Sequence, residues 1–296
     1  MAINERLETY KSETCWQYDI RVKNREEDLV LANIAQQDAA QLRICDFDFS
    51  FEEKDLIFNE VKTFIERHEW LGRLGLYPTH FFTARYKGML AGVIIMDMPN
   101  AFSKMLGENT KKLERLISRG ACVSWSPKNL ASALIGFSIK WMVKNTPYRL
   151  FTAYSDSEAG EIGTIYQACN FYYLGAKFGT KVQFQNENGR WVSDRYFRSR
   201  SVYKRMAVNL GIQWVDGWQV RDRVFFDKMP EEIAKAIKQA SKDYMESCVK
   251  RTLPQKGKYA YVQGKTKKET KYLREVFKDK NKVVVYPKRF AEVENN

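Results

Sequence analysis

A carboxylate and a phenol lie ten residues apart in the segment from Arg149 to Gly175, Asp156 first and Tyr166 after it. Asp156 follows a short, apolar, β-prone run, residues 150–154, and is therefore predicted at the end of a strand. A carboxylate there can accept a proton from a substrate amine, and a phenol nearby can donate one. Both side chains are therefore candidates for acid–base catalysis, although Asp156 has a simpler interpretation as a helix cap.

Tyr166 is predicted on one face of a short helix. The i, i+3, i+4, i+7 spacing that marks such a face is kept by Ile162, Ile165, Tyr166 and Cys169. A core tyrosine explains this pattern most simply. Gly163 favours a second interpretation, because glycine is unfavourable within a helix and here would leave room for a ligand beside an accessible phenol.

The elements that must position these side chains are short strands alternating with helices. Turn-forming pairs, Lys87-Gly88 and Asn188-Gly189, separate β-prone runs and predict two hairpins. The pattern predicts, in order, a hairpin over residues 80–96, a strand over 113–125, a loop over 126–129, a buried apolar helix over 130–145 and a hairpin over 183–193. We expect an α/β (α+β) fold with a mixed central sheet flanked by helices.

Composition favours a globular protein that is not inserted in a membrane. The 296 residues are 44% hydrophobic and 14% aromatic, which is ample for a packed core. The start, MAINERLETY, lacks the basic flank and apolar run of a signal peptide. The most apolar stretch, residues 130–143, carries Lys140 and is shorter than the roughly 20 residues of a membrane span. We therefore expect a cytoplasmic location.

The thiols and imidazoles do not form a recognisable metal motif. The five cysteines are scattered, with no C-x-x-C pair, which is typical of free thiols in a reducing cytoplasm. His68 and His80 are the two histidines of the chain. No metal site is predicted.

Positive charge is concentrated near the C-terminus. Residues 250–290 contain fourteen Lys and Arg against three Asp and Glu, a net charge of +11 out of +13 for the chain. Such a segment attracts a polyanion and predicts nucleic acid as partner, although a solubilising tail is the alternative. KYAYVQG, TKKETKYLREVFKD and KVVVYPKR predict a small strand-helix-strand module, in which the expected DNA contacts are Lys267, Lys268, Lys288 and Arg289.

A second basic cluster interleaves cations with aromatic residues in SDRYFRSRSVYKR. Such a mixture can hold phosphates and stack on a base, and an amphipathic edge strand is the alternative. The expected DNA contacts here are Arg195, Arg198, Arg200, Lys204 and Arg205. We expect a catalytic domain over residues 1–230, with a helical extension at its N-terminus, and a basic C-terminal module over residues 231–296.

The order hairpin, strand, loop, buried helix, strand, short helix, strand resembles the GNAT acyltransferase fold. Within it, LERLISRG, SPKNLAS and YSDSEAGEIGTIYQACNFYYLG resemble the bacteriophage Mom family of DNA-modifying proteins, as do RHEWLGRLGLYP upstream and the closing YPKR. The resemblance covers most of the chain from about Ile65 to Arg289, and GTIYQACN is its most specific part.

The resemblance implies a transferase that adds a small acyl or carbamoylmethyl-type group to an exocyclic amine of phage DNA, with adenine N6 favoured. Host restriction nucleases would then no longer recognise their sites. It implies double-stranded DNA and a small-molecule donor as partners, in the cytoplasm of an infected bacterium. The motif positions expected to be catalytic are Arg115, Ser132, Asp156 and Tyr166.

The fold resemblance implies acetyl-CoA or another acyl-CoA-like donor, with one departure. The Arg/Gln-x-x-Gly-x-Gly/Ala loop that holds the coenzyme A pyrophosphate in GNAT enzymes is missing before the buried helix. The residues that stand there instead, and that we expect to bind the donor, are Ser124, Ser126, Lys128 and Asn129. Backbone N–H groups at a helix start suit a phosphate, although Ser126 or Asn129 can equally be plain N-caps.

Arg115 lies within a predicted strand, where an inward-pointing arginine needs a carboxylate or a donor phosphate, and a solvent-facing arginine is the alternative. Two further functions stay open. A GNAT acetyltransferase acting on a protein, a small molecule or a hypermodified base explains the fold but not the basic module. A non-enzymatic DNA-binding protein explains only the charge.

Overall fold

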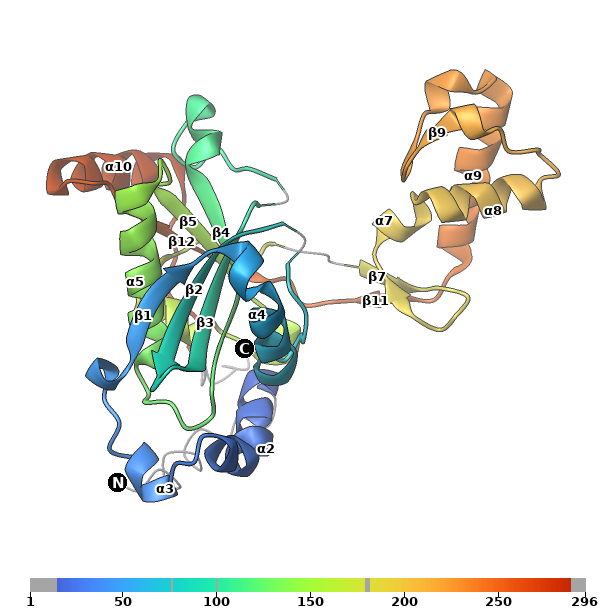
Figure 1. Cartoon of the computed structure of the whole chain (residues 1–296). Helices are drawn as coiled ribbons and strands as arrows, with labels where there is room; N and C mark the ends of the chain where they lie inside the picture. Colours follow the sequence, from blue (N-terminus) through green and yellow to red (C-terminus); the bar gives the residue numbers. More distant parts are fainter. Residues whose placement is uncertain (1–14, 76, 100, 179–181, 289–296) are drawn as a thin grey trace, which may run out of the picture. The chain divides into compact units, whose positions relative to one another are not determined.

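The computed structural model describes residues 15–75, 77–99, 101–178 and 182–288 (Figure 1). The chain divides into two compact units: unit 1 comprises residues 1–177 and 256–296, and unit 2 comprises residues 178–255. Unit 2 is thus an insertion within unit 1. This division differs from the boundary expected at residue 230, because the chain returns after unit 2 to complete the sheet of unit 1.

In the described part of unit 1, a seven-stranded sheet has the order β1-β2-β3-β4-β5-β12-β6. Its strands are β1 (Asp48–Glu52), β2 (Pro78–Tyr86), β3 (Met89–Asp97), β4 (Glu114–Cys122), β5 (Leu150–Ser155), β6 (Tyr172–Tyr173) and β12 (Gly257–Val262). Neighbours are antiparallel except β4 and β5, which are parallel. The expected fold class, a mixed central sheet flanked by helices, is confirmed.

Helices cover both faces of this sheet (Figure 1). Unit 1 contains α2 (Trp16–Leu31), α3 (Gln36–Ala39), α4 (Lys54–His68), α5 (Leu130–Asn145), α6 (Thr164–Ala168) and α10 (Lys267–Lys280), with 3₁₀ turns at Ile44–Asp46, Glu108–Leu113 and Ser157–Ala159. Phe81 contacts Phe58 of α4, whereas its neighbour Phe82 contacts Phe137 of α5. Successive residues of a strand point to opposite faces, so α4 and α5 lie on opposite sides of the sheet. This explains why the middle of β2 and almost all of β3 are buried.

The parallel strands β4 and β5 separate soon after they begin. They pair only over Glu114–Leu116 with Leu150–Thr152, whereas β4 continues to Cys122 and β5 to Ser155. Beyond this point β5 pairs on its other side alone, with β12. The second half of β4 and the end of β5 therefore face each other without forming a ladder.

The basic C-terminal segment is part of unit 1 rather than a module of its own. Its predicted first strand and helix are confirmed as β12 and α10. β12 lies between β5 and β6 in the sheet. In this position Tyr259, Ala260 and Val262 are fully buried. The predicted last strand is wrong over the residues described, where its recorded β contact is a single bridge between Val284 and Tyr173.

Unit 2 has its own small core. It contains α7 (Asp194–Phe197), α8 (Arg200–Asn209), α9 (Glu231–Ser247) and 3₁₀ turns at Asp216–Trp218 and Phe226–Lys228, with strands β7 (Val182–Gln185), β8 (Trp191–Val192), β9 (Gln219–Val220), β10 (Arg223–Val224) and β11 (Lys250–Thr252). β7 and β8 form the predicted hairpin. Val202, Met206 and Ile237 join α8 to α9 in the buried cluster.

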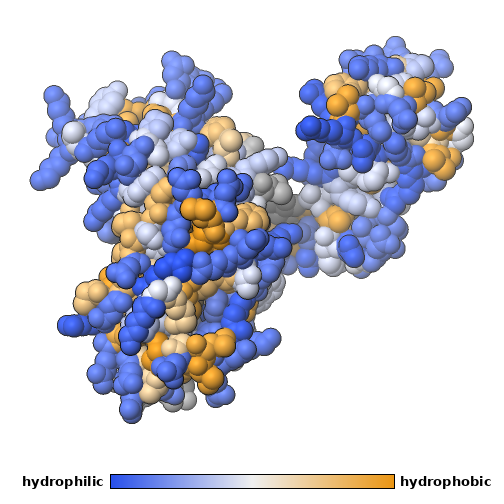
Figure 2. Space-filling model, in the orientation of Figure 1, coloured by the Kyte–Doolittle hydropathy of each residue, from blue (hydrophilic) through white to orange (hydrophobic). Residues whose placement is uncertain are grey.

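Hydrophilic residues dominate the visible surface, with hydrophobic residues in small patches (Figure 2). Across the part of the chain that the structure describes, no helix is both long and apolar enough to span a bilayer.

Candidate functional site

Asp156 lies at the end of β5, as predicted. Its Oδ1 accepts a 3.1 Å hydrogen bond from the backbone N–H of Glu158, and its Oδ2 lies 2.5 Å from Nζ of Lys256. Lys256 precedes β12, whose first residue Gly257 pairs with Ser155, so strand pairing brings this lysine beside Asp156. Asp156 thus caps the 3₁₀ turn, as the simpler interpretation has it, and also forms an ion pair.

Glu161 closes a turn back onto Asp156. Its Oε2 accepts a 2.9 Å hydrogen bond from the backbone N–H of Asp156, and its Oε1 accepts one of 2.9 Å from Nε1 of Trp70. Gly160 makes the turn possible, because its φ of 70° is a left-handed conformation that glycine adopts at little cost. Burial raises the pKa of Glu161, and the charge of Asp156 raises it further. The carboxylate of Glu161 is therefore a stronger base than that of a free glutamate.

Tyr166 packs beside this carboxyl. Its ring lies 5.4 Å from that of Phe171 and 5.3 Å from that of Tyr259, which agrees with the core interpretation. Burial raises its pKa, and the charge of Glu161 is the next largest cause. The hydroxyl therefore stays protonated and can act as a donor.

The expected space for a ligand at Gly163 is filled. A Cβ on Gly163 would lie 2.4 Å from the ring of Tyr259, whose hydroxyl donates a 2.6 Å hydrogen bond to the carbonyl of Ile162. Gly163 has a φ of 66° and caps the start of α6. This glycine therefore admits the ring of Tyr259 from β12, and the interpretation as space for a ligand is wrong.

The segment after α4 supplies a second carboxyl and a loop. Glu69 Oε2 accepts 3.1 Å hydrogen bonds from the backbone N–H groups of Leu71 and Gly72, and Oε1 lies 3.9 Å from Nε of Arg119. Burial raises the pKa of Glu69. Glu69, Arg119 and Glu161 all perturb the pKa of Tyr166, so they surround one region beside the second half of β4.

Asp97, at the end of β3, adds a third buried carboxyl near Arg119. It is 3% exposed, and its Oδ1 has no hydrogen-bond partner among the described residues. Burial raises its pKa, and Arg119 opposes this effect. Carboxyl groups with raised pKa values that lie close together mark a candidate functional site.

Arg115 lies elsewhere. Its guanidinium stacks over the ring of Tyr148, with 3.6 Å between Cζ and the ring centroid, and donates a 2.8 Å hydrogen bond to the carbonyl of Glu114. The expected carboxylate or phosphate partner is thus replaced by an aromatic face, and the solvent-facing alternative is wrong because Arg115 is 8% exposed. Arg115 pairs with Phe151, five residues before Asp156, or roughly 16 Å along a strand.

The residues at the start of α5 make mostly local contacts. Ser132 Oγ donates a 2.9 Å hydrogen bond to the carbonyl of Asn129, and Ser132 O accepts one of 3.8 Å from Sγ of Cys169. Ser132 is thus close to α6, although its hydroxyl bonds its own helix. Asn129 occupies the N-cap position without a side-chain cap bond, and Lys128 is exposed. The plain N-cap interpretation of Asn129 is therefore wrong.

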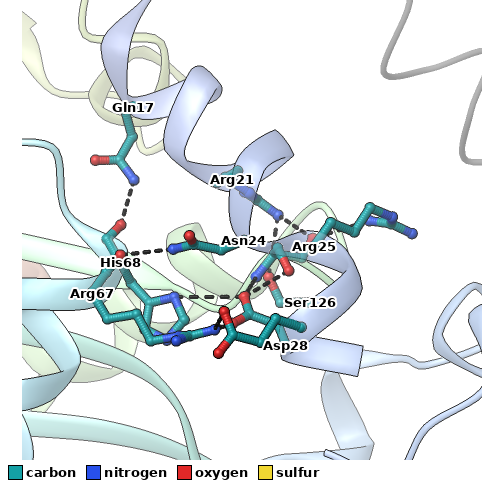
Figure 3. A network of polar contacts seen from close by, with 10 residues as sticks. Gln17, Arg21, Asn24, Arg25, Asp28, Arg67, His68 and Ser126 are labelled. Atoms are coloured by element: carbon teal, nitrogen blue, oxygen red, sulfur yellow. Dashed lines mark hydrogen bonds and ion pairs between the residues drawn. The ribbon is translucent and has the colours of Figure 1, made fainter. Parts of the chain in front are cut away.

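Ser124 and Ser126 join a polar network with α2 (Figure 3). Asp28, 4% exposed, accepts hydrogen bonds from Ser124 Oγ at 2.7 Å and from Arg67 Nη2 at 2.9 Å. Gln17 of the same helix donates to the carbonyl of His68, which belongs to the end of α4. The N-terminal helix thereby fixes both the loop before α5 and the end of α4.

Two arginines of α2 point at that loop. Arg21 Nη2 lies 3.3 Å from Ser124 O and 3.5 Å from Ser126 Oγ, and Arg25 Nη1 lies 3.2 Å from the same carbonyl (Figure 3). Arg25 Nε and Nη2 are buried and have no hydrogen-bond partner in the described part of the chain. Burial lowers the pKa of Arg25, and the charge of Arg21 lowers it further. Two neighbouring guanidinium groups, one of them with two unpartnered nitrogens, fit an anionic group.

The five predicted DNA contacts in unit 2 lie on or beside α7 and α8, not on an edge strand. Arg198 pairs with Asp194, Arg200 with Asp222 at 3.4 Å, and Arg205 with Glu187, and Lys204 lies over the ring of Trp214. Arg195 is exposed. Of the aromatic residues in this segment, Phe197 and Tyr203 are buried, so neither presents its ring for stacking, whereas Tyr196 is half-buried and its hydroxyl donates a hydrogen bond to Glu187. Base stacking by Tyr196 stays a prediction.

In the C-terminal segment, Lys267 and Lys268 are exposed in the first turn of α10, and Lys288 is exposed near the end of the described chain. Arg289 lies outside the described residues.

The sequence interpretation did not include Glu69, Trp70, Arg119, Glu161 or Lys256. Glu69 and Trp70 lie within RHEWLGRLGLYP, a segment noted only for its resemblance, and Glu161 directly follows the Gly160 turn. A glycine that turns the chain back beside a candidate Asp could have identified Glu161. Lys256 is 100 residues from Asp156, and only strand pairing brings the two together. Among the described residues, no group of three or more His, Cys, Asp or Glu could hold a metal ion.

Comparisons with known proteins give a family and remote structural relatives. The model of the Mom protein family matches residues 58–288. No curated protein matches the sequence.

The similar solved structures are acetyltransferases. A GNAT family acetyltransferase from Elizabethkingia anophelis with acetyl-CoA bound is 10% identical, with a TM-score of 0.32 over 74% of this chain and 99% of that one. The IAA acetyltransferase from Bacillus cereus is 12% identical, with a TM-score of 0.33 over 50% and 93%. The N-acetyltransferase from Staphylococcus aureus is 14% identical, with a TM-score of 0.32 over 49% and 92%. At this level of similarity they identify neither donor nor acceptor for this chain.

Proposed function

This chain belongs to the Mom protein family, a phage DNA-modification family, and from this premise we propose that it is a transferase that modifies a base of double-stranded DNA. The observation that carries the proposal is Glu161, a half-buried carboxyl bonded to Trp70 and to the backbone of Asp156, with the phenol of Tyr166 beside it. A carboxylate whose pKa is raised and a protonated phenol in one place offer the base and the proton donor that transfer to a weakly basic amine needs.

The favoured acceptor is the exocyclic amine of adenine. Its lone pair is delocalised into the ring, so a catalyst must hold the amine in place and accept its proton. Glu161 takes that proton, because burial makes its carboxylate a better base. Tyr166 supplies a proton to the leaving atom. This assignment revises the role expected of Asp156, which now positions Glu161 through its backbone N–H and engages Lys256.

For the donor, we propose an acyl-CoA-like molecule, which when bound supplies an activated acyl group. Arg21 and Arg25 would hold its phosphates, since both guanidinium groups reach the loop before α5, which occupies the place of the missing glycine loop. The 16-residue helix α5 begins just after this loop, and the partial positive charge of its N-terminus adds to the attraction. Modified bases would protect phage DNA from restriction in the host cytoplasm.

Expression in bacteria followed by mass spectrometry of the DNA nucleosides tests the proposal. We expect a new nucleoside in cells that make the wild-type chain and its loss with Glu161→Gln. Glu66→Gln, which removes an exposed carboxylate of α4, is the matched control and should retain the product. An unchanged nucleoside profile from folded wild-type protein would overturn the proposal and favour acyl transfer to a protein or small molecule.

A further inference from the structure

One side of α10 carries cations only four or three residues apart. Lys267, Lys271, Arg274 and Lys278 follow one another at i, i+4, i+7 and i+11, which keeps them along one stripe of the helix. The three lysines are exposed, and Arg274 is partly buried. We call these four residues the α10 stripe.

No acidic side chain forms an ion pair with the α10 stripe among the residues that the structure describes. The acidic residue of the first turn, Glu269, is turned to Arg149, with 2.9 Å between Oε1 and Nε. On other helices some lysines pair with a glutamate four residues away, as Lys62 does with Glu66 and Lys235 does with Glu231. Like charges at this spacing destabilise a helix by about 0.2–0.5 kcal/mol per pair. Other contacts of α10 must therefore offset the repulsion among the four cations of the stripe.

The main contacts are apolar and come from residues beside the stripe. Phe277 is fully buried in a cluster with Leu150 and Val262, and Leu273 packs against it. Arg274 Nε also donates a 3.2 Å hydrogen bond to the carbonyl of Val262. Because its apolar face is already buried in unit 1, α10 cannot insert that face into a lipid surface.

A groove of about 570 Å³ runs beside the α10 stripe. Its lining includes all four stripe residues and Lys265, against a single acidic residue, Glu275. The α10 end of unit 1 is hydrophilic in the space-filling view (Figure 2). A concave surface with this excess of positive charge fits the backbone of a polyanion.

We propose that the α10 stripe and its groove bind the phosphate backbone of double-stranded DNA, which rests on the proposed function for the choice of DNA. From Lys267 to Lys278 the helix rises about 16 Å, at about 1.5 Å per residue, and each DNA strand carries a phosphate every 3.4 Å or so along the duplex axis. The stripe is therefore long enough to contact several phosphates. Lysine head groups are hydrated point charges, which suits binding independent of sequence.

The salt dependence of duplex binding tests this site. The full chain is compared with the variant Lys267→Gln/Lys271→Gln/Lys278→Gln and with the control Lys62→Gln/Lys104→Gln/Lys140→Gln, which loses the same charge from other helices and loops of unit 1. All six lysines are exposed, so each variant should keep the melting temperature of the wild type. Affinity for a short DNA duplex is measured between about 50 and 200 mM salt.

We expect the slope of log K against log salt to be smaller by roughly 2 to 3 in the stripe variant, since each phosphate contact contributes about 0.9, so that the variant binds about 100- to 1000-fold more weakly at about 0.1 M salt. For the control variant, the slope of log K against log salt should fall by less than half of that amount. Equal losses in both variants, or none in either, would overturn the site. The nucleoside profile of cells that make the wild-type chain tests the base-modifying function separately. If no new nucleoside forms but the stripe variant still binds DNA more weakly than the control, only the base-modifying function is contradicted.

Discussion

The indole nitrogen of Trp70 donates a 2.9 Å hydrogen bond to Oε1 of Glu161, across 91 residues of sequence. This bond stabilises the ionised carboxylate and so lowers the pKa that burial has raised. Gln17 Oε1 in turn accepts the backbone N–H of Trp70 at 3.1 Å, so the N-terminal helix holds the indole in place.

Trp70→Phe should therefore move the pH dependence of base modification. Loss of the donor raises the pKa of Glu161 further, and a general base must be ionised to work, so the acidic limb of the rate profile moves to higher pH. A hydrogen bond to a charged group contributes about 1.5–3 kcal/mol, so its loss should move the limb by an amount that a rate profile resolves. A reduced rate with an unmoved limb would show that Trp70 has a packing role only.

Arg25→Ala should weaken donor binding without unfolding the protein. The guanidinium is desolvated beside Arg21 and leaves two nitrogens unbonded, so its removal also relieves repulsion. With coenzyme A as probe, calorimetry should show affinity reduced at least about tenfold, the lower end expected for a charged hydrogen bond. Arg43→Ala, which removes an exposed arginine, is the control and should bind as the wild type does. Unchanged affinity in Arg25→Ala would place the donor phosphates elsewhere.

Gly163→Ala and Gly136→Ala should have opposite effects on thermal stability. At Gly163 a Cβ meets the Tyr259 ring at 2.4 Å and φ is 66°, so we expect a destabilisation of about 2 kcal/mol or more. At Gly136, within α5, nothing lies within 4 Å of the added Cβ, and alanine should stabilise by about 0.5–1 kcal/mol. Circular dichroism melts measure both, and a stable Gly163→Ala would mean that Tyr259 moves freely.

His80 should make the fold sensitive to mild acid. Burial, aided by the charge of Arg115, lowers its pKa from 6.5 to about 4. The unfolded chain then binds more protons than the folded one between these values, so this contribution to stability is present above pH 6.5 and is lost as the pH falls toward 4. His80→Gln should show a smaller drop in melting temperature between neutral pH and about pH 4.5 than the wild type. Parallel curves would assign the acid sensitivity to other groups.

Local sequence patterns were sufficient to predict most of the helices and strands of unit 1. The turn at Lys87 and Gly88 has φ values of 49° and 82°, the pair of positive angles that a tight hairpin turn requires, and the predicted hairpin is β2 and β3. The apolar run over residues 130–145 is α5. These features depend on neighbours in sequence, which a pattern can detect.

The candidate site is formed by the pairing of strands that are distant in sequence, which no local sequence pattern indicates. β12 lies between β5 and β6 although about a hundred residues separate it from β5, and this pairing brings Lys256 to Asp156 and Tyr259 to Gly163. Asp156 and Tyr166 could be proposed from their own segment, whereas Glu161 becomes a base candidate only through burial and the bond from Trp70. Arg115 was placed on the correct strand but at its distant end.

The insertion of unit 2 leaves both of its attachment points side by side. Within unit 2, Val182 near its start pairs with Thr252 near its end, and within unit 1, Tyr173 pairs with Tyr259. A chain that leaves and re-enters between adjacent strands behaves topologically like a long hairpin loop. Unit 2 is thus an insertion whose two ends lie at neighbouring places in the chain path of unit 1, as the two ends of a hairpin loop do.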